Sequence, residues 1–193
     1  IHHSLCGHNS QLLARGRLRS LRRAAGVFGF HLAAVDLRQN SDVHGRVVAE
    51  LLRTAGVIDD YTQLAEGARI ALLRRELASN RLLSSPYAAY SDEVRSELAI
   101  AHAAAGAHDR YGNACITTYI ISKCESVSDL LEVNLLLKEA GLYQPNAPAE
   151  ASIMVVPLFE TIGDLEHAPQ IMHEWLALPE VFAAVERRGY QEV

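Results

Sequence analysis

The chain has 193 residues, of which 49% are hydrophobic and 21% charged, and these proportions exclude disordered and collagen-like proteins. Its 18 Lys and Arg residues stand against 23 Asp and Glu residues, so the formal net charge is −5. That acidic balance argues against a dedicated nucleic-acid-binding domain, which is normally basic.

Apolar residues occur in runs far shorter than the roughly 20 residues that cross a bilayer, so we expect no membrane partner. Cys6, Cys115 and Cys124 are too few for a closed disulfide framework, which favours reduced thiols in the cytoplasm. The chain begins with Ile, so we interpret residues 1–193 as one fragment of a larger protein. We expect residues 1–10 to be disordered and residues 11–193 to form the fold.

The first helical pattern covers residues 11–25 and places Ala14, Leu18 and Leu21 on one face. Five arginines occupy the same stretch: Arg15, Arg17, Arg19, Arg22 and Arg23. No aromatic residue lies among them, so we interpret them as a solvated helix face rather than a nucleic-acid-binding surface.

The first predicted strand follows at residues 30–37 (FHLAAVDL), because a short continuous apolar run indicates a strand that is buried on both faces. A helix is predicted next, from about residue 42 to residue 55. Ser41 can cap its start, and Gly56 stands just after its end, where glycine is favoured.

Two further helices are predicted at residues 62–77 and 92–110, the second capped by Ser91. Between them, residues 81–90 (RLLSSPYAAY) have the composition of a long loop. Residues 114–122 (ACITTYIIS) form the second apolar run and therefore the second predicted strand.

The last third repeats this pattern. Ser126 and Asp129 have the spacing of a capping box for a helix that ends near Ala140, before Gly141. Residues 152–159 (SIMVVPLF) form the third predicted strand. The capping-box spacing then recurs at Thr161-Ile-Gly-Asp164, before the final helices.

Strand, helix and strand in this order predict a βαβ unit with parallel strands. The fold class is therefore a helix-rich α/β fold with about three parallel strands and six to seven helices. Three strands cannot close a barrel, and so many helices over so small a sheet predict a piece of a larger α/β structure.

Functional groups of parallel α/β folds gather beyond the carboxyl ends of the strands. Here those ends carry Asp36 and Arg38, then Ser122-Lys123-Cys124-Glu125, then Glu160. A guanidinium and a carboxylate on one rim suit an anionic substrate and a hard divalent cation. Charged residues are also common wherever a strand returns to solvent, so this spacing alone leaves a purely structural role open.

Three segments at these positions, in this order, resemble phosphoenolpyruvate carboxylase, particularly its bacterial forms: FHLAAVDLRQNSDVH, ITTYIISKCESVSDLLEVNLLLKEAGL and VVPLFETIGDLEHAP. The resemblance covers nearly the whole chain from Leu12 onward. It implies that the strands belong to a partial β/α (TIM-type) barrel. It also implies an enzyme that joins phosphoenolpyruvate and bicarbonate to give oxaloacetate and phosphate, through carboxyphosphate and the enolate of pyruvate, with Mg²⁺ or Mn²⁺ and usually as a homotetramer.

The resemblance assigns a role to two residues of this chain. Arg38 matches the arginine of the family's D-[IL]-R-Q motif, which contacts the substrate phosphate, and a planar fork of donors suits that task. Glu160 matches the glutamate of PLFET, a ligand of the catalytic metal, and a carboxylate suits a hard cation. We therefore expect Arg38 as a catalytic and substrate-binding residue and Glu160 as a metal ligand.

The chain also departs from the family pattern. Asn40 replaces a frequent Glu, and ISKCES replaces a stretch that more often reads ISMA, so Lys123 and Cys124 are atypical. The catalytic histidine motif TAHPTE does not occur in the chain, and the resemblance places the second metal carboxylate in a GYSDS-x-KD motif beyond it. We therefore expect the fragment alone to be inactive, and a non-catalytic scaffold or partner-binding piece remains the alternative.

Most other candidate residues are given no functional role. His2, His3, Cys6 and His8 match no closed zinc spacing. His102 and His108 are six residues apart, off register for one helix face, so we interpret them as surface or structural residues. His44 follows the DLRQ motif, yet a structural histidine is the simpler interpretation, and Cys115 suits an inert core thiol. Cys124, beside Lys123, is the more reactive candidate.

Overall fold

The computed structural model describes residues 1–29 and 33–193, which divide into two compact units, residues 1–34 and residues 35–193. The first unit holds α1 (His2–Gly7), α2 (Gln11–Ala14) and α3 (Arg17–Phe28). The predicted helix over 11–25 is thus broken, because Gly16 takes a positive φ of 79°. The arginines of α3 are exposed, as predicted, but Leu21 on its apolar face is also 66% exposed.

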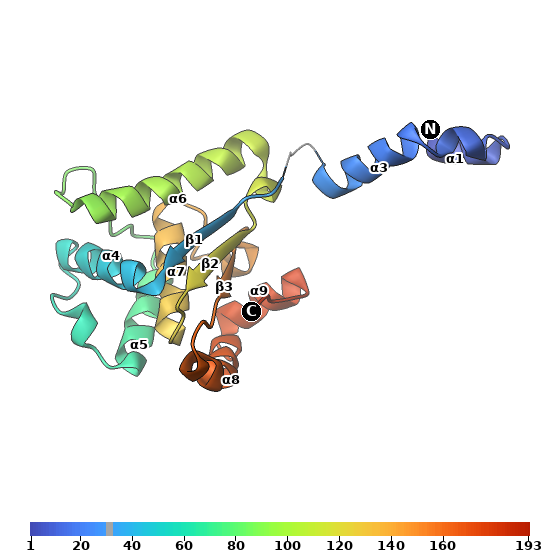
Figure 1. Ribbon diagram of the computed structural model, residues 1–193. Helices are drawn as coiled ribbons and strands as arrows, with labels where there is room; N and C mark the ends of the chain where they lie inside the picture. The colour runs from blue at the N-terminus through green and yellow to red at the C-terminus, as the bar shows by residue number, and fades with distance from the viewer. Residues whose placement is uncertain (30–32) are drawn as a thin grey trace. The chain divides into compact units, whose positions relative to one another are not determined.

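The second unit is built on three parallel strands in the order β1-β2-β3: β1 (Asp36–Asn40), β2 (Thr118–Ser122) and β3 (Met154–Pro157) (Figure 1). The predicted parallel sheet is confirmed. In its register Arg38 lies opposite Ile120, and Ile120 lies opposite Val156. These three residues therefore share one face of the sheet, because side chains alternate along each strand. The sheet is open, with β1 and β3 at its edges.

The first strand lies later in the chain than predicted. Residues 30–32 of the predicted strand fall outside the described residues, and residues 33–35 form no strand. The observed strand is the polar stretch DLRQN, which pairs only with β2. None of its five residues is buried, so its sequence need not be continuously apolar, and the apolar-run criterion misplaced the strand.

The helices of this unit are α4 (Ser41–Thr54), α5 (Glu66–Leu77), α6 (Asp92–Tyr111), α7 (Val127–Glu139), α8 (Ile162–Leu176) and α9 (Pro179–Arg188). With α1–α3 they make nine α-helices in the described residues, more than the six to seven predicted. Three short 3₁₀ turns join them: η1 (Tyr61–Gln63), η2 (Asn113–Cys115) and η3 (Pro148–Glu150). The first occupies the start of the helix predicted at 62–77, and the second the start of the strand predicted at 114–122.

Helix α7 is the centre of the unit and passes behind the sheet in the view of Figure 1. It contacts α4, α5, α6, α8 and β3. Leu130, Leu131, Val133 and Leu135 are fully buried, and the helix is buried on every side. Such a helix shows no amphipathic stripe in its sequence, because no side faces water.

Most predicted helix caps are confirmed, and one is wrong. Both capping boxes are formed, at the starts of α7 and α8, and Ser91 caps α6. The cap of α4 is Asn40 rather than Ser41, because the Asn40 side chain accepts from the Asp42 amide. The Ser41 hydroxyl is used elsewhere, donating to the Lys123 carbonyl at 2.6 Å.

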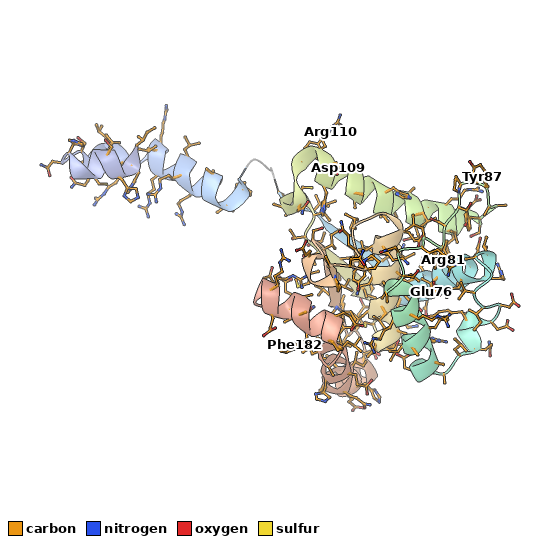
Figure 2. The ribbon with its side chains drawn as sticks, turned by 180° about the vertical axis from the view of Figure 1, so that it is seen from behind. Glu76, Arg81, Tyr87, Asp109, Arg110 and Phe182 are labelled. Carbon is orange, nitrogen blue, oxygen red and sulfur yellow. The ribbon has the colours of Figure 1, made fainter. Side chains whose placement is uncertain are left out.

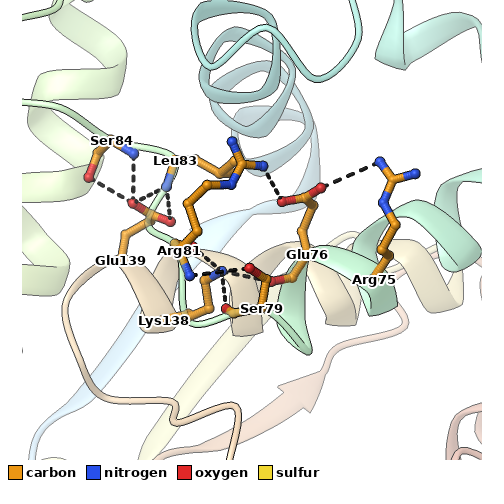
Figure 3. A network of polar contacts seen from close by, with 8 residues as sticks. All are labelled: Arg75, Glu76, Ser79, Arg81, Leu83, Ser84, Lys138 and Glu139. Atoms are coloured by element: carbon orange, nitrogen blue, oxygen red, sulfur yellow. Dashed lines mark hydrogen bonds and ion pairs between the residues drawn. The ribbon is translucent and has the colours of Figure 1, made fainter.

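Residues 78–91 form a loop, which confirms the predicted loop at 81–90. Figure 2 shows Tyr87 projecting from it, and this side chain is 97% exposed. Two buried residues of α7 hold the start of the loop (Figure 3). Lys138 Nζ donates to the carbonyls of Glu76, Ser79 and Arg81, and the Glu139 carboxylate accepts from Leu83 and Ser84.

The outer edge of β3 is partly covered by residues near Val193. The side-chain amide of Gln191 donates to the Val155 carbonyl at 2.9 Å. That contact satisfies one of the backbone groups that an edge strand leaves unpaired. Within the parts of the chain that the structure describes, no helix combines the length and apolar character needed to span a membrane.

Candidate functional site

Arg38 connects the carboxyl ends of all three strands. Its Nε donates to Ser122 Oγ at 2.8 Å, at the end of β2. Its Nη2 lies 3.2 Å from Glu160 Oε1, three residues beyond β3. The prediction that the strand ends bring Arg38 and Glu160 to one rim is therefore confirmed. The sequence identifies Ser122 only as a strand end and does not reveal its contact with Arg38.

The Arg38–Glu160 pair faces solvent, with side chains 58% and 39% exposed. Because the guanidinium is open to solvent, an anion can reach it directly. Nη1 of Arg38 makes no hydrogen bond within residues 1–29 and 33–193. The site therefore presents free N–H donors and a hard carboxylate oxygen side by side, the groups that bind a phosphate and a divalent cation.

Glu160 is positioned by the start of α8. The Asp164 carboxylate accepts from the backbone amides of Glu160 and Thr161, at 3.2 and 2.9 Å. The Thr161 backbone bond is the largest of several hydrogen bonds that lower the pKa of Asp164. Asp164 is thus a capping residue, which confirms the role its spacing predicts, and it fixes the backbone that carries Glu160.

Lys123 follows β2 directly and holds an unusual backbone conformation, with φ at 57°. Its ammonium lies 3.1 Å from Asp42 Oδ2 and 3.8 Å from Glu125 Oε1. The hydrogen bond with Asp42 raises the pKa of Lys123, so it stays a cation. This atypical residue is therefore a paired cation at the carboxyl end of β2. Sequence analysis did not foresee its partner, Asp42.

The cysteines beside the strands are core residues. Cys124 is fully buried, and burial raises the pKa of its thiol to about 12. A thiol with that pKa is protonated at neutral pH, so the structure contradicts the expectation of a more reactive Cys124. Cys115 is 9% exposed, as predicted for a core thiol. It lies in the η2 turn and not in a strand, so its predicted position was wrong.

The histidines of α4 and α6 are structural or lie on the surface, as predicted. His44 is fully buried in α4, where Nε2 lies 3.0 Å from the Tyr119 hydroxyl, and burial lowers its pKa to about 4. His108 Nε2 lies 2.7 Å from the Ile116 carbonyl oxygen. His102 is exposed on α6.

The residues available for a metal ion are few. Among the described residues, no group of three or more His, Cys, Asp or Glu side chains is placed to hold one. In the first unit, Cys6 Sγ lies 3.9–4.0 Å from the ring nitrogens of His2. These two residues alone are too few ligands for a metal site. At the strand rim Glu160 offers a donor of the right chemistry, but it is a single carboxylate.

Comparison with known proteins identifies relatives of this chain. The family model described as phosphoenolpyruvate carboxylase matches residues 1–193. A protein of Aromatoleum aromaticum with that name is 58% identical over 93% of this chain and 19% of its own length. Proteins of the same name from Azorhizobium caulinodans and Rhodopseudomonas palustris are 54% and 53% identical over the whole chain and 20% and 21% of their own lengths.

The chain thus spans about a fifth of the length of the curated relatives it matches. The match includes the stretch with DLRQ, whose Arg38 joins the strand ends, and the PLFET stretch that carries Glu160. From the matching family model and from relatives that are more than 50% identical, the chain belongs to the phosphoenolpyruvate carboxylase family.

Proposed function

We propose that this chain supplies part of the active site of an enzyme that carboxylates phosphoenolpyruvate with bicarbonate to give oxaloacetate and phosphate. In this reaction the phosphoryl group passes from phosphoenolpyruvate to bicarbonate, which leaves the enolate of pyruvate and carboxyphosphate. Carboxyphosphate releases phosphate and CO₂, and the enolate carbon attacks CO₂. The observation that carries the proposal is the Arg38 guanidinium, which bonds Ser122 and Glu160 across the three strand ends.

Arg38 is the residue that we assign to the substrate phosphate. Ser122 fixes its Nε, so the plane of the guanidinium is held while the Nη groups point to the exposed rim. Such a fork can donate to two phosphate oxygens at once and follow the group as it is transferred. Lys123, close by after β2, is paired with Asp42 and Glu125, so its charge is neutralised locally and we assign it no role at the phosphate.

Glu160 is the residue that we assign to Mg²⁺ or Mn²⁺, which would polarise the oxygens of the substrates. Its carboxylate is the right type of donor, but one carboxylate does not make an octahedral site. Further ligands would come from outside the described residues. If the Glu160 carboxylate were to hold the metal ion instead of accepting from Arg38, the Arg38 Nη2–H would be free to donate to the phosphate.

The arrangement of strands also supports a place within a β/α barrel. Arg38, Ile120 and Val156 share the sheet face opposite α7, as the inward-facing residues of barrel strands would. We further propose that the parent enzyme is cytoplasmic, in keeping with the three free cysteines of the described residues. The family resemblance also implies a homotetramer. The 193-residue chain alone is expected to lack activity, because it contains no TAHPTE histidine.

The test is Arg38→Ala in the full-length parent enzyme. Loss of the phosphate contact should lower kcat/KM by about 10³-fold or more, in the range seen when one transition-state donor is removed. Arg46→Ala is a matched control, because Arg46 pairs with Glu93 on an exposed surface of α4 and α6. A variant at Arg38 with near-normal turnover would overturn the assignment.

A further inference from the structure

A cavity of about 30 Å³ lies where α7, α8 and α9 meet β3. Apolar side chains such as Leu131, Val155 and Val181 form much of its wall. Trp175 and Arg188 also line it. The cavity combines an apolar wall with a few polar groups, as ligand sites do, but it has room only for a very small molecule. It shares no lining residue with the Arg38–Glu160 rim.

The indole of Trp175 is the first unusual feature of this cavity. The side chain is 3% exposed, and its Nε1–H has no acceptor among the residues that the structure describes. Buried indole N–H groups normally find a partner, because a donor that loses water without gaining an acceptor destabilises the fold. An acceptor placed in the cavity would remove this cost.

Arg188 is the second unusual feature. It forms no ion pair or hydrogen bond within the described parts of the chain, whereas Arg187 pairs with Glu150 at 2.7 Å. Partial burial lowers the pKa of Arg188, which shows that its charge is poorly solvated. Glu180 also lines the cavity, but its two carboxylate oxygens are engaged by Arg74 at 2.6 and 3.0 Å. The positive charge of Arg188 is therefore not neutralised by Glu180.

We propose that this cavity binds a small carboxylate anion, whose oxygens accept from the Trp175 indole and the Arg188 guanidinium. The volume accommodates about two water molecules, and so limits the anion to about three or four heavy atoms, as in formate or acetate. A methyl group would lie against Val155 and Val181. The carboxylate would provide the acceptor that Trp175 lacks and the counter-charge that Arg188 lacks.

The chain contains one tryptophan, so a single indole signal reports on the cavity. We would titrate the 193-residue chain with sodium acetate at constant ionic strength, with sodium chloride as the balancing salt. The Trp175 fluorescence and its indole ¹H–¹⁵N cross-peak should change and saturate at millimolar acetate. Arg188→Gln should weaken the apparent affinity about tenfold or more, because a charge-assisted hydrogen bond is lost.

Arg187→Gln is the matched control, because it removes an equal charge from the adjacent residue outside the cavity. The affinity of this variant for acetate should stay within about twofold of that of the unaltered chain. Ala184→Leu tests the cavity independently of charge, since Ala184 lines it and a larger side chain would fill it. Circular dichroism checks that each variant is folded. A signal that does not saturate, or equal acetate affinity in the Arg188→Gln and Ala184→Leu variants and the unaltered chain, would overturn the proposal.

Discussion

Arg38 Nη2 and Glu160 Oε1 lie 3.2 Å apart, although 122 residues separate them in the chain. The parallel strands bring them together, because β1 and β3 flank β2 and all three end at the same edge. The pair is exposed, so water screens most of its attraction. These two residues are therefore placed for chemistry at the rim more than for the stability of the fold.

The first prediction separates those two roles. Arg38→Ala should change the free energy of unfolding of the 193-residue chain by less than about 1 kcal/mol, the range for exposed ion pairs. Urea denaturation followed by circular dichroism measures this. A loss above about 2 kcal/mol would mean that Arg38 is mainly structural, and lost activity in the parent enzyme could then be explained by unfolding.

The second prediction concerns the metal. One carboxylate cannot displace enough water from Mg²⁺ or Mn²⁺ to hold it, since Mg²⁺ dehydrates reluctantly and requires six oxygen ligands. The chain alone should therefore bind Mn²⁺ no better than a surface carboxylate does, without saturation in a calorimetric titration at submillimolar concentration. Saturable binding that disappears in Glu160→Gln but persists in Glu166→Gln would contradict this, because Glu166 is an exposed residue of α8.

The third prediction concerns Glu132, which lies on α7 and is 1% exposed. Its Oε1 accepts from the Tyr61 hydroxyl at 2.8 Å, its Oε2 has no partner in the described structure, and Gly45 of α4 lies against it. Burial is the main cause that raises its pKa from 4.5 to about 8, with Asp129 and Glu66 adding repulsion and Arg69 opposing it. At neutral pH the carboxyl is therefore largely protonated.

A carboxyl with a raised pKa binds its proton more tightly in the folded state than in the unfolded state. Its contribution to stability is thus fully present below about pH 4.5 and is lost as the pH rises through about 8. Glu132→Gln removes this titration. Denaturant melts from pH 5 to pH 9 should show a difference between the original chain and the variant that grows with pH in favour of the variant. Parallel curves across this range would show that Glu132 ionises normally.

The parts of the fold that sequence predicts are those that neighbouring residues determine. Ser126 with Asp129, and Thr161 with Asp164, form capping boxes because all partners lie within four residues. Ser41 shows the opposite case. By local rules it should cap α4, but the distant Lys123 carbonyl takes its hydroxyl and Asn40 caps the helix instead. Tertiary contacts of this kind are invisible in a single sequence.

The candidate site shows the same contrast between features that the sequence predicts and features that depend on tertiary contacts. The strand-end rule places Arg38 and Glu160 at one rim, since it needs only the order of the strands. It does not predict that Ser122 holds the guanidinium, which depends on the register of β1 and β2. Nor does it reveal Glu132, because α7 is buried on every side and its charged residues look like those of an ordinary solvated helix.

The last prediction concerns Lys138, a cation that is only 2% exposed. Its Nζ donates to the carbonyls of Glu76, Ser79 and Arg81 at 2.7, 3.0 and 2.7 Å, and so ends α5 and holds the start of the loop over 78–91 (Figure 3). Lys138→Met fills a similar volume but leaves three carbonyls without this donor. The free energy of unfolding should fall by about 2–4 kcal/mol, measured by urea denaturation.

Lys123→Met is the matched control for that substitution, because it makes the same chemical change at an exposed ion pair. Its effect on the free energy of unfolding should be small, because water screens an exposed ion pair. Limited proteolysis provides a local measurement: Lys138→Met should be cut faster within the loop, whereas Lys123→Met should be cut at the original rate. If the two variants have equal stability and equal cleavage rates, water satisfies the three carbonyls as well as Lys138 does, and the ammonium does not anchor the loop.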